Sequence, residues 1–98
     1  MGNRLELVLQ GDDGVRSHVF AEVEEVTVGR SSGSMLHIDH ASVSRQHAVL
    51  RLREGDWEIE DLESRHGTWV NGRRLRGGDR AIVATGDVVQ IRPWSLLV

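Results

Sequence analysis

The sequence predicts an all-β fold, a sandwich or barrel of short strands that together form one domain. Turn signals built on Gly, Asp and Asn recur about every 8–12 residues along the chain. Between them, apolar and polar residues alternate with the two-residue period that gives a strand one apolar face. Hydrophobic residues make up 39% of the 98 positions and charged residues 28%, which indicates a folded domain rather than a disordered or collagen-like chain.

Most of the expected strands follow directly from this alternation. Near the N-terminus, Leu5, Leu7 and Leu9 alternate with polar neighbours, and a turn follows at 11–14. The clearest hairpin signal is the pair Asn71-Gly72, because both residue types tolerate the positive φ of a tight turn. In chain order, the expected strands cover residues 4–10, 25–28, 36–38, 47–53, 57–60, 69–70, a partner around 75, 81–84, 88–91 and 94–98.

Residues 15–26 fit two kinds of structure. The valines from Val15 to Val26 recur at spacings of four, four and three, as they would on one face of a helix. However, valine is β-branched and the segment lacks a clear pair of helix caps, and both features favour strands. We therefore expect strands in this segment. We place the only proline, Pro93, at a sheet edge or a bulge, where its missing N–H is tolerated.

Several classes of protein are excluded. No apolar run approaches the ~18 residues needed to cross a bilayer, and the N-terminus lacks the apolar stretch of a signal peptide. The chain has no cysteine, so disulfides, zinc–thiolate sites and thiol catalysis are ruled out. These features are typical of a cytoplasmic protein, and we expect that setting. We also expect residues 1–98 to be a single domain taken from a longer protein, because the sequence ends on an apolar strand.

The distribution of charge indicates an anionic ligand. The net charge of −3 and the pI of about 5.9 argue against a nucleic-acid binder driven by overall charge. All twelve basic residues are arginine, and residues 30–53 and 64–80 together carry +7. Residues 54–63 hold six acids and no base, which we interpret as a solvated strand face. Arginine presents a flat fork of donors that suits carboxylate or phosphate.

Three segments, 29–35, 39–46 and 63–68, interrupt the strand pattern and are rich in small polar residues and arginine. A strand, a turn and a second strand separate the second loop from the third, so these two loops should emerge at the same end. By the same count the first loop should point to the other end. The strand at 36–38 is short enough to cross between sheets and bring the first two loops together, and the sequence leaves both arrangements open.

The side chains of these loops suit an oxyanion. Arg30, Arg45 and Arg65 supply fixed positive charge, and Ser44 and Ser64 supply hydroxyl donors. Glycines in the same loops allow backbone N–H groups to approach an anion closely. Charge-assisted hydrogen bonds contribute roughly 1.5–3 kcal/mol each, so two or three of them recognise a phosphate. The chain has no lysine, which excludes a Walker-type phosphate loop.

Four motifs occur in a characteristic order: Val28-Gly29-Arg30-Ser31, Val43-Ser44-Arg45-Gln46-His47, the stretch from Asp61 to Gly72, and Gly86-Asp87-Val88-Val89. Each is weak alone, but the ordered set resembles the forkhead-associated (FHA) domain over nearly the whole chain. The resemblance implies an FHA/SMAD-like β-sandwich of about 11 mostly antiparallel strands. It also implies binding of phosphothreonine peptides through loops at one end of the sandwich.

The resemblance also assigns roles to individual residues. It implies phosphate or peptide contacts for Arg30, Ser44, Arg45, Ser64, Arg65 and His66. It implies structural support of the site by Gly29, His47, Gly67, Thr68, Asn71 and Gly72. At position 66 the family usually has an asparagine that grips the peptide main chain, whereas imidazole donates one hydrogen bond, or two when charged. We therefore expect peptide affinity to depend on pH between about 5 and 8.

We expect a protein-binding module and not an enzyme. The expected partner is a protein phosphorylated on threonine by a Ser/Thr kinase, in trans or within the same longer chain. We expect no nucleic acid, membrane, cofactor or metal. The alternative is a phospho-independent interaction or assembly module on the same fold. A hydrolase dyad of Ser44 and His47 is disfavoured, because an offset of three residues places them on opposite faces of a strand.

Three further groups of residues could have either a functional role or a purely structural one. The histidines match no metal-ligand spacing. Arg73, Arg74, Arg76 and Arg80 either extend the ligand groove or decorate an exposed hairpin, and the sequence leaves this open. We expect the tryptophans at 57, 69 and 94 in the core, rather than as a platform for stacking bases.

Overall fold

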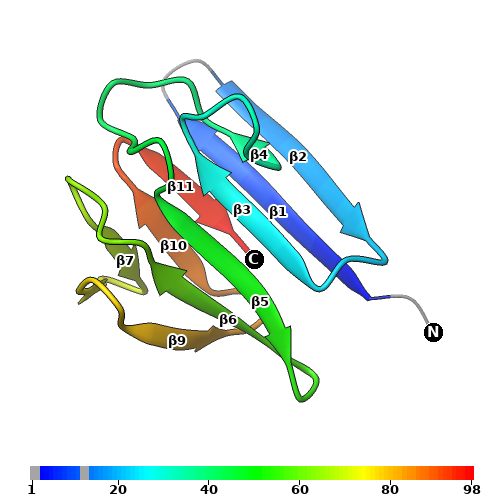
Figure 1. Cartoon of the computed structure of the whole chain (residues 1–98). Coiled ribbons are helices and arrows are strands. Elements are labelled where there is room, and N and C mark those ends of the chain that lie inside the picture. Colours follow the sequence, from blue (N-terminus) through cyan, green and yellow to red (C-terminus); the bar gives the residue numbers. More distant parts are fainter. Residues whose placement is uncertain (1–2, 12–13) are drawn as a thin grey trace.

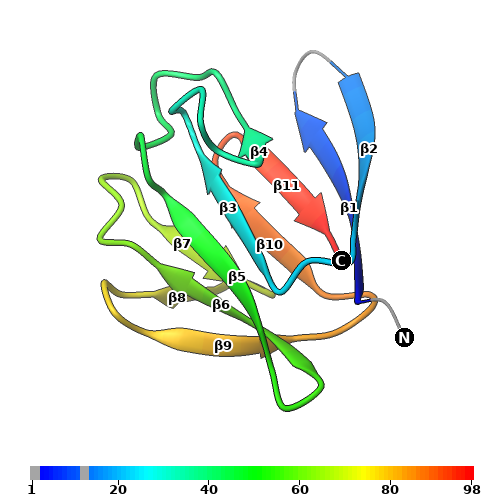
Figure 2. The same ribbon diagram turned by 45° about the vertical axis from the view of Figure 1, so that its right-hand side comes forward.

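The structure, a computed structural model, describes residues 3–11 and 14–98, which form eleven strands in two sheets (Figures 1 and 2). The six-stranded sheet has the order β2 (Gly14–Ala21), β1 (Arg4–Gly11), β11 (Trp94–Leu97), β10 (Val88–Ile91), β7 (Thr68–Val70) and β8 (Arg73–Leu75). The five-stranded sheet has the order β4 (Leu36–His37), β3 (Glu25–Gly29), β5 (Ala48–Arg53), β6 (Asp56–Asp61) and β9 (Arg80–Val83). The predicted β-sandwich of mostly antiparallel strands is confirmed.

The core lies between the two sheets and is built from the apolar positions of the alternating strands. Leu5, Leu7 and Leu9 of β1 are all buried, and their polar neighbours face outward. Trp94 is in this core and Trp57 packs against it, as expected. The prediction is wrong for Trp69, which lies on the outer face of its sheet beneath two arginine guanidinium groups.

The ambiguous segment after the first turn is a strand, as predicted. β2 pairs with β1 from Gly14 to Ala21, whereas the turn expected at 11–14 falls partly outside the described residues. Val15 and Val19 are 61% and 52% exposed, on the outer face of the sheet. A spacing of four is an even number, so it keeps two residues on one face of a strand as well as of a helix. The spacing therefore did not distinguish the two structures, but the β-branched residue type did.

β4 settles how the three loops are arranged. It pairs in parallel with β3, with Val28 opposite Leu36 and Gly29 opposite His37. A parallel pair does not reverse the chain, so the loop before β4 and the loop after it emerge at the same end. The short strand does not cross between sheets, because it extends the edge of the sheet that already holds β3. All three loops therefore gather at one end of the sandwich (Figures 1 and 2).

Two turns show how the connections are built. Asn71 and Gly72 have φ values of 49° and 83°, the positive φ at both positions that the hairpin between β7 and β8 requires. The hairpin prediction is confirmed. Pro93 lies neither on a free edge nor in a bulge, but in the turn that joins the paired residues Ile91 and Trp94. This position suits proline because no ladder hydrogen bond from its nitrogen is needed.

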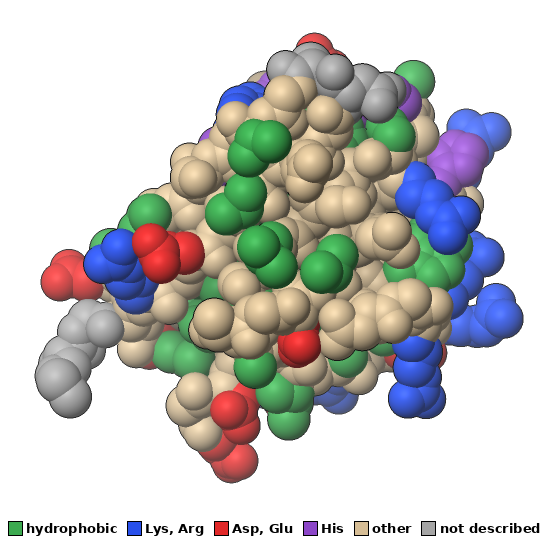
Figure 3. All heavy atoms as spheres, turned by 180° about the vertical axis from the view of Figure 1, so that it is seen from behind, with side chains coloured by type: hydrophobic (Ala, Val, Ile, Leu, Met, Phe, Trp, Pro, Cys, Tyr) green, Lys and Arg blue, Asp and Glu red, His purple; other side chains and the backbone are tan. Residues whose placement is uncertain are grey.

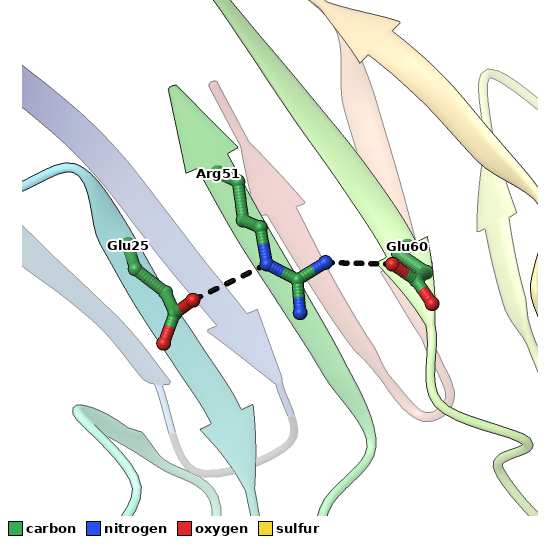
Figure 4. Close-up of polar contacts among 3 residues, drawn as sticks. All are labelled: Glu25, Arg51 and Glu60. Atoms are coloured by element: carbon green, nitrogen blue, oxygen red, sulfur yellow. Dashed lines mark hydrogen bonds and ion pairs between the residues drawn. The ribbon is translucent and has the colours of Figure 1, made fainter. Parts of the chain in front are cut away.

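The acidic segment 54–63 is not simply a solvated face. Glu60 of β6 and Glu25 of β3 flank Arg51 of β5, with nitrogen–oxygen distances of 2.6 and 3.2 Å (Figure 4). Asp61 at the end of β6 is 2% exposed and belongs to the interior. Arg51 is therefore neutralised within the fold. The arginines of segment 30–53 that remain available to a ligand are fewer than the charge count suggested.

Candidate functional site

The three loops enclose a pocket of about 310 Å³ at one end of the sandwich. The pocket is lined by Arg30, Ala41, Ser42, Val43, Ser44, Arg45, Arg65 and His66. Five of the six residues expected to contact phosphate or peptide are among them, and Ser64 is not. The sequence did not single out the residues at 41–43, although they lie within the predicted loop 39–46.

Arg30, one of the lining residues, is held in place by hydrogen bonds to the neighbouring loop. Its backbone N–H donates to the carbonyl of Ser44 at 2.9 Å, and its side-chain Nε donates to the carbonyl of Val43 at 3.0 Å. The side chain is half-buried, so its conformation is restricted by the neighbouring loop. No other hydrogen bond within the described residues engages the guanidinium, so its two terminal amino groups are available to a ligand. These two groups form the fork that matches a phosphate or carboxylate.

Ser44 and the two exposed arginines complete the donor set. The Oγ of Ser44 accepts a hydrogen bond from the Arg65 N–H at 2.9 Å, so its own proton is free to donate to an anion. Within residues 3–11 and 14–98, no carboxylate forms an ion pair with Arg30, Arg45 or Arg65. The pocket thus presents three uncompensated guanidinium groups and one oriented hydroxyl, an arrangement that suits a doubly charged tetrahedral anion.

His47 ties the loops together from inside the fold. It is fully buried; its Nδ1 accepts from the Ser44 N–H at 3.1 Å, and its Nε2 donates to the carbonyl of Gly67 at 2.9 Å. These partners require the neutral tautomer with the proton on Nε2. Both ring nitrogens are therefore engaged by the backbone. The ring forms no hydrogen bond with the Ser44 hydroxyl, so the described residues contain no Ser44–His47 dyad.

We expect the domain to lose stability on mild acidification because of His47. Burial lowers the pKa of His47 below its ordinary value of 6.5. Below about pH 6.5 this histidine becomes protonated in the unfolded chain while it stays neutral in the folded chain. The free energy of unfolding therefore falls as pH falls, by up to about 1.4 kcal/mol per pH unit. Urea unfolding at pH 7.5 and 5.5 measures the loss. An NMR titration in which the His47 ring gains its proton at or above pH 6.5 would contradict this expectation.

Ser64 does not line the pocket, and its hydrogen bonds are made to Asp61 and Gly67. Its Oγ donates to Asp61 Oδ1 at 2.5 Å and accepts from the Gly67 N–H at 3.0 Å. Its N–H donates to Asp61 Oδ2 at 3.1 Å, and Thr68 Oγ1 donates to Asp61 Oδ1 at 2.7 Å. The Ser64 proton is thus already used within the loop. In this structure Ser64 shapes the loop that carries Arg65 and His66.

Asp61 is the functional residue that the sequence reasoning missed. Its side chain accepts the hydrogen bonds that shape the loop after β6, whereas the sequence pattern predicts that it lies on a solvated acidic face. A signal was available, because Ile59 is buried and Asp61 follows it by two residues on the same face of the strand. A carboxylate on the core face of a strand must be satisfied by nearby donors.

Glycine is required where the loops approach one another most closely. A Cβ at Gly29 would lie 2.1 Å from the carbonyl oxygen of Arg45, a distance that no side chain allows. The absence of a side chain lets the backbone N–H of Ser31 donate to that same oxygen at 3.1 Å. Gly67 adopts a φ of 95°, and this conformation directs its carbonyl to His47. Both glycines therefore support the pocket.

Asn71 supports the hairpin, not the pocket. Its Oδ1 accepts from the Val88 N–H at 2.9 Å and its Nδ2 donates to Asp87 Oδ1 at 3.1 Å. The Ala84 N–H and the Asn71 amide hold the pKa of Asp87 below its usual value, because both donate to its carboxylate. Gly72 completes the turn beside Asn71, and neither residue lines the pocket.

Two further observations concern the described residues as a whole. Nowhere in 3–11 and 14–98 do three histidine or acidic side chains come together as ligands for a metal ion. The same residues include no helix with the length and apolar character needed to cross a bilayer.

Comparison with known proteins places the chain beside FHA domains. A family model described as FHA domain matches residues 26–92. The glycogen accumulation regulator GarA of Mycolicibacterium smegmatis is 33% identical over 96 residues, which cover 98% of this chain and 58% of GarA. The chain spans about half the length of the curated relatives it matches.

Solved structures agree with the sequence relatives. EmbR of Mycobacterium tuberculosis in complex with a low-affinity phosphopeptide superposes with a TM-score of 0.80 and 25% identity, over 94% of this chain and 24% of EmbR. A structure from a study of phosphothreonine-dependent FHA domain interactions superposes with a TM-score of 0.78 and 26% identity. It covers 95% of this chain and 94% of its own.

Proposed function

The chain belongs to the FHA domain family, and on that premise we propose that it is a protein-interaction module that recognises phosphothreonine in a partner protein. The observation that carries the proposal is the convergence of Arg30, Ser44 and Arg65, from three separate loops, on one pocket. The partner is a protein phosphorylated by a Ser/Thr kinase, in trans or within the same longer chain. Residues 1–98 act as one domain of that longer chain.

The phosphate is held between Arg30 and Ser44 in this proposal. The free amino groups of Arg30 donate to two phosphate oxygens, and the Ser44 hydroxyl donates to a third. Arg45 and Arg65 stand on the rim and neutralise the remaining charge. A bare threonine hydroxyl supplies none of these acceptors and leaves the arginines without a partner, so discrimination by charge is expected.

His66 contacts the peptide main chain in this proposal. It is exposed and lines the pocket beside Arg65, and no hydrogen bond within the described residues engages its ring. Its ring is therefore available to a peptide. The choice of threonine rests on the family, since the structural neighbour with 26% identity comes from work on phosphothreonine-dependent interactions.

A phosphothreonine peptide is expected to bind at least about 30-fold more tightly than its unphosphorylated twin, because the three charge-assisted hydrogen bonds from Arg30 and Ser44 are lost without the phosphate. Fluorescence anisotropy with a degenerate library, in which only the central phosphothreonine is fixed, measures the ratio without knowledge of the flanking motif. A second library with unmodified threonine is the control. Equal affinity for both libraries, or no binding of either, favours the phospho-independent interaction module instead.

A further inference from the structure

A second cluster of arginines lies on β8 and β9, which are edge strands of the two sheets, and on the connection between them. Arg73 and Arg74 are on β8, Arg80 begins β9, and Arg76 lies in the connection between the two strands. Among the described residues, the arginines that form ion pairs are Arg4 and Arg51, so this cluster has no carboxylate partner within 4.0 Å. Figure 3 shows arginine side chains gathered along one border of the molecule, on the side of the binding loops and β7.

These arginines surround a groove of about 690 Å³, roughly twice the volume of the phosphate pocket. It is lined by Val70, Arg73, Arg74, Leu75, Arg76, Asp79, Arg80 and Ala81. Val70 and Leu75 are 9% and 6% exposed and provide an apolar floor. β8 is the last strand of one sheet and β9 the last strand of the other, so both edges of the groove have unpaired backbone groups.

The connection between β8 and β9, which carries Arg76, is an ordered turn. Asp79, the single acid in the lining, accepts from the Arg76 N–H through Oδ2 at 3.0 Å, and its own N–H donates to the Arg76 carbonyl at 2.8 Å. Gly78 N–H donates to the backbone carbonyl of Asp61 at 3.2 Å, which anchors the turn to β6. The Asp79 carboxylate thus stabilises the turn through the Arg76 N–H and forms no ion pair with an arginine of the groove.

We propose that this groove is a second peptide-binding site, which takes an acidic segment of a partner protein in extended conformation. Carboxylates of the segment pair with Arg73, Arg76 and Arg80, and an apolar side chain rests on Val70 and Leu75. Arginine suits this role because its planar fork matches a carboxylate and its stem covers apolar surface. The chain as a whole is acidic, so an acidic partner is attracted to its arginine-rich surfaces, of which this groove is one, and repelled by its acidic surfaces.

The groove adjoins the phosphate pocket through Arg74. The guanidinium carbon of Arg74 lies 5.2 Å from the centroid of the Trp69 ring, and a Cβ at Gly67 would lie 3.0 Å from Arg74 Nε. Arg74 therefore stands between the groove and the loop that carries Arg65. A single partner chain can reach both sites, but the groove binds its acidic segment without any phosphate, so the inference stands independently of the proposed function.

The test uses a labelled decapeptide of glutamates around one central leucine, with a glutamine-for-glutamate peptide as control. The wild-type chain at low salt is expected to bind only the acidic peptide. The groove variant Arg73→Gln/Arg76→Gln/Arg80→Gln is expected to bind it at least tenfold more weakly. The matched variant Arg4→Gln/Arg16→Gln/Arg53→Gln removes the same charge from exposed arginines on other strands and is expected to bind as wild type does.

Two further measurements distinguish binding in the groove from binding elsewhere on the chain. NMR shifts induced in the wild-type chain are expected at β8 and β9, and the variant Arg30→Ala is expected to bind the acidic peptide normally. Equal weakening in both triple variants would show that only net charge matters and would overturn the proposal. Failure of the wild-type chain to bind the acidic peptide, or shifts confined to the phosphate pocket, would overturn it too.

Discussion

Arg30→Ala is expected to weaken binding of a phosphothreonine peptide by about 30-fold or more, equivalent to about 2 kcal/mol. The free amino groups of Arg30 are the most constrained donors in the pocket, because its Nε is already bonded to the Val43 carbonyl. The substitution therefore removes a pre-oriented fork, not a mobile charge. Isothermal titration with a peptide selected from the phosphothreonine library measures the change.

Two variants separate this effect from loss of charge and from loss of fold. Arg53→Ala removes the same charge from an exposed position at the end of β5, outside the pocket, and is expected to change the affinity less than twofold. Arg30→Lys keeps the charge but loses the fork and is expected to fall in between. The fold should survive Arg30→Ala, since one half-buried hydrogen bond contributes only about 1 kcal/mol. An unchanged dissociation constant for Arg30→Ala would remove this residue from the site.

The strands could be predicted because alternation and turn residues act locally. The alternation of Leu5, Leu7 and Leu9 with polar residues predicts which face of the strand is buried, and no information from the rest of the chain is needed. In the same way, Asn71-Gly72 alone predicts a hairpin. The direction of β4 could not be predicted in this way. Whether a two-residue strand runs parallel or antiparallel depends on its partner, and its partner β3 is chosen by tertiary packing. Parity counting failed for the first loop for this reason alone.

The site was predictable as a set of residue types, and less so as a geometry. The arginines and Ser44 could be predicted as candidate ligand-binding residues because charge and donor chemistry can be read directly from the sequence, and they line one pocket. Ser64 has the same chemistry as Ser44, yet its proton is committed to Asp61 while the proton of Ser44 is free. Only the three-dimensional arrangement of the loop distinguishes a hydroxyl that donates within its own loop from one that faces a pocket.

Asp61 links the two proposed sites of the molecule. Its carboxylate accepts from Ser64 N–H, Ser64 Oγ and Thr68 Oγ1, and these bonds shape the loop beside the phosphate pocket. Its backbone carbonyl accepts from the Gly78 N–H and anchors the turn beside the arginine groove. Removal of a buried carboxylate that accepts this many hydrogen bonds lowers the free energy of unfolding strongly, because each of its donors is left without an acceptor and away from water.

Asp61→Ala is therefore expected to lower the free energy of unfolding by about 3–5 kcal/mol, a large fraction of the 5–15 kcal/mol typical of a small domain. Urea unfolding followed by tryptophan fluorescence measures the loss. Asp56→Ala, an exposed acid in the same strand, is the matched control and should stay within about 0.5 kcal/mol of wild type. Thr68→Val removes one donor together with its need for an acceptor, so it should cost only about 1 kcal/mol. If Asp61→Ala costs no more than Asp56→Ala, the three hydrogen bonds do not hold this loop.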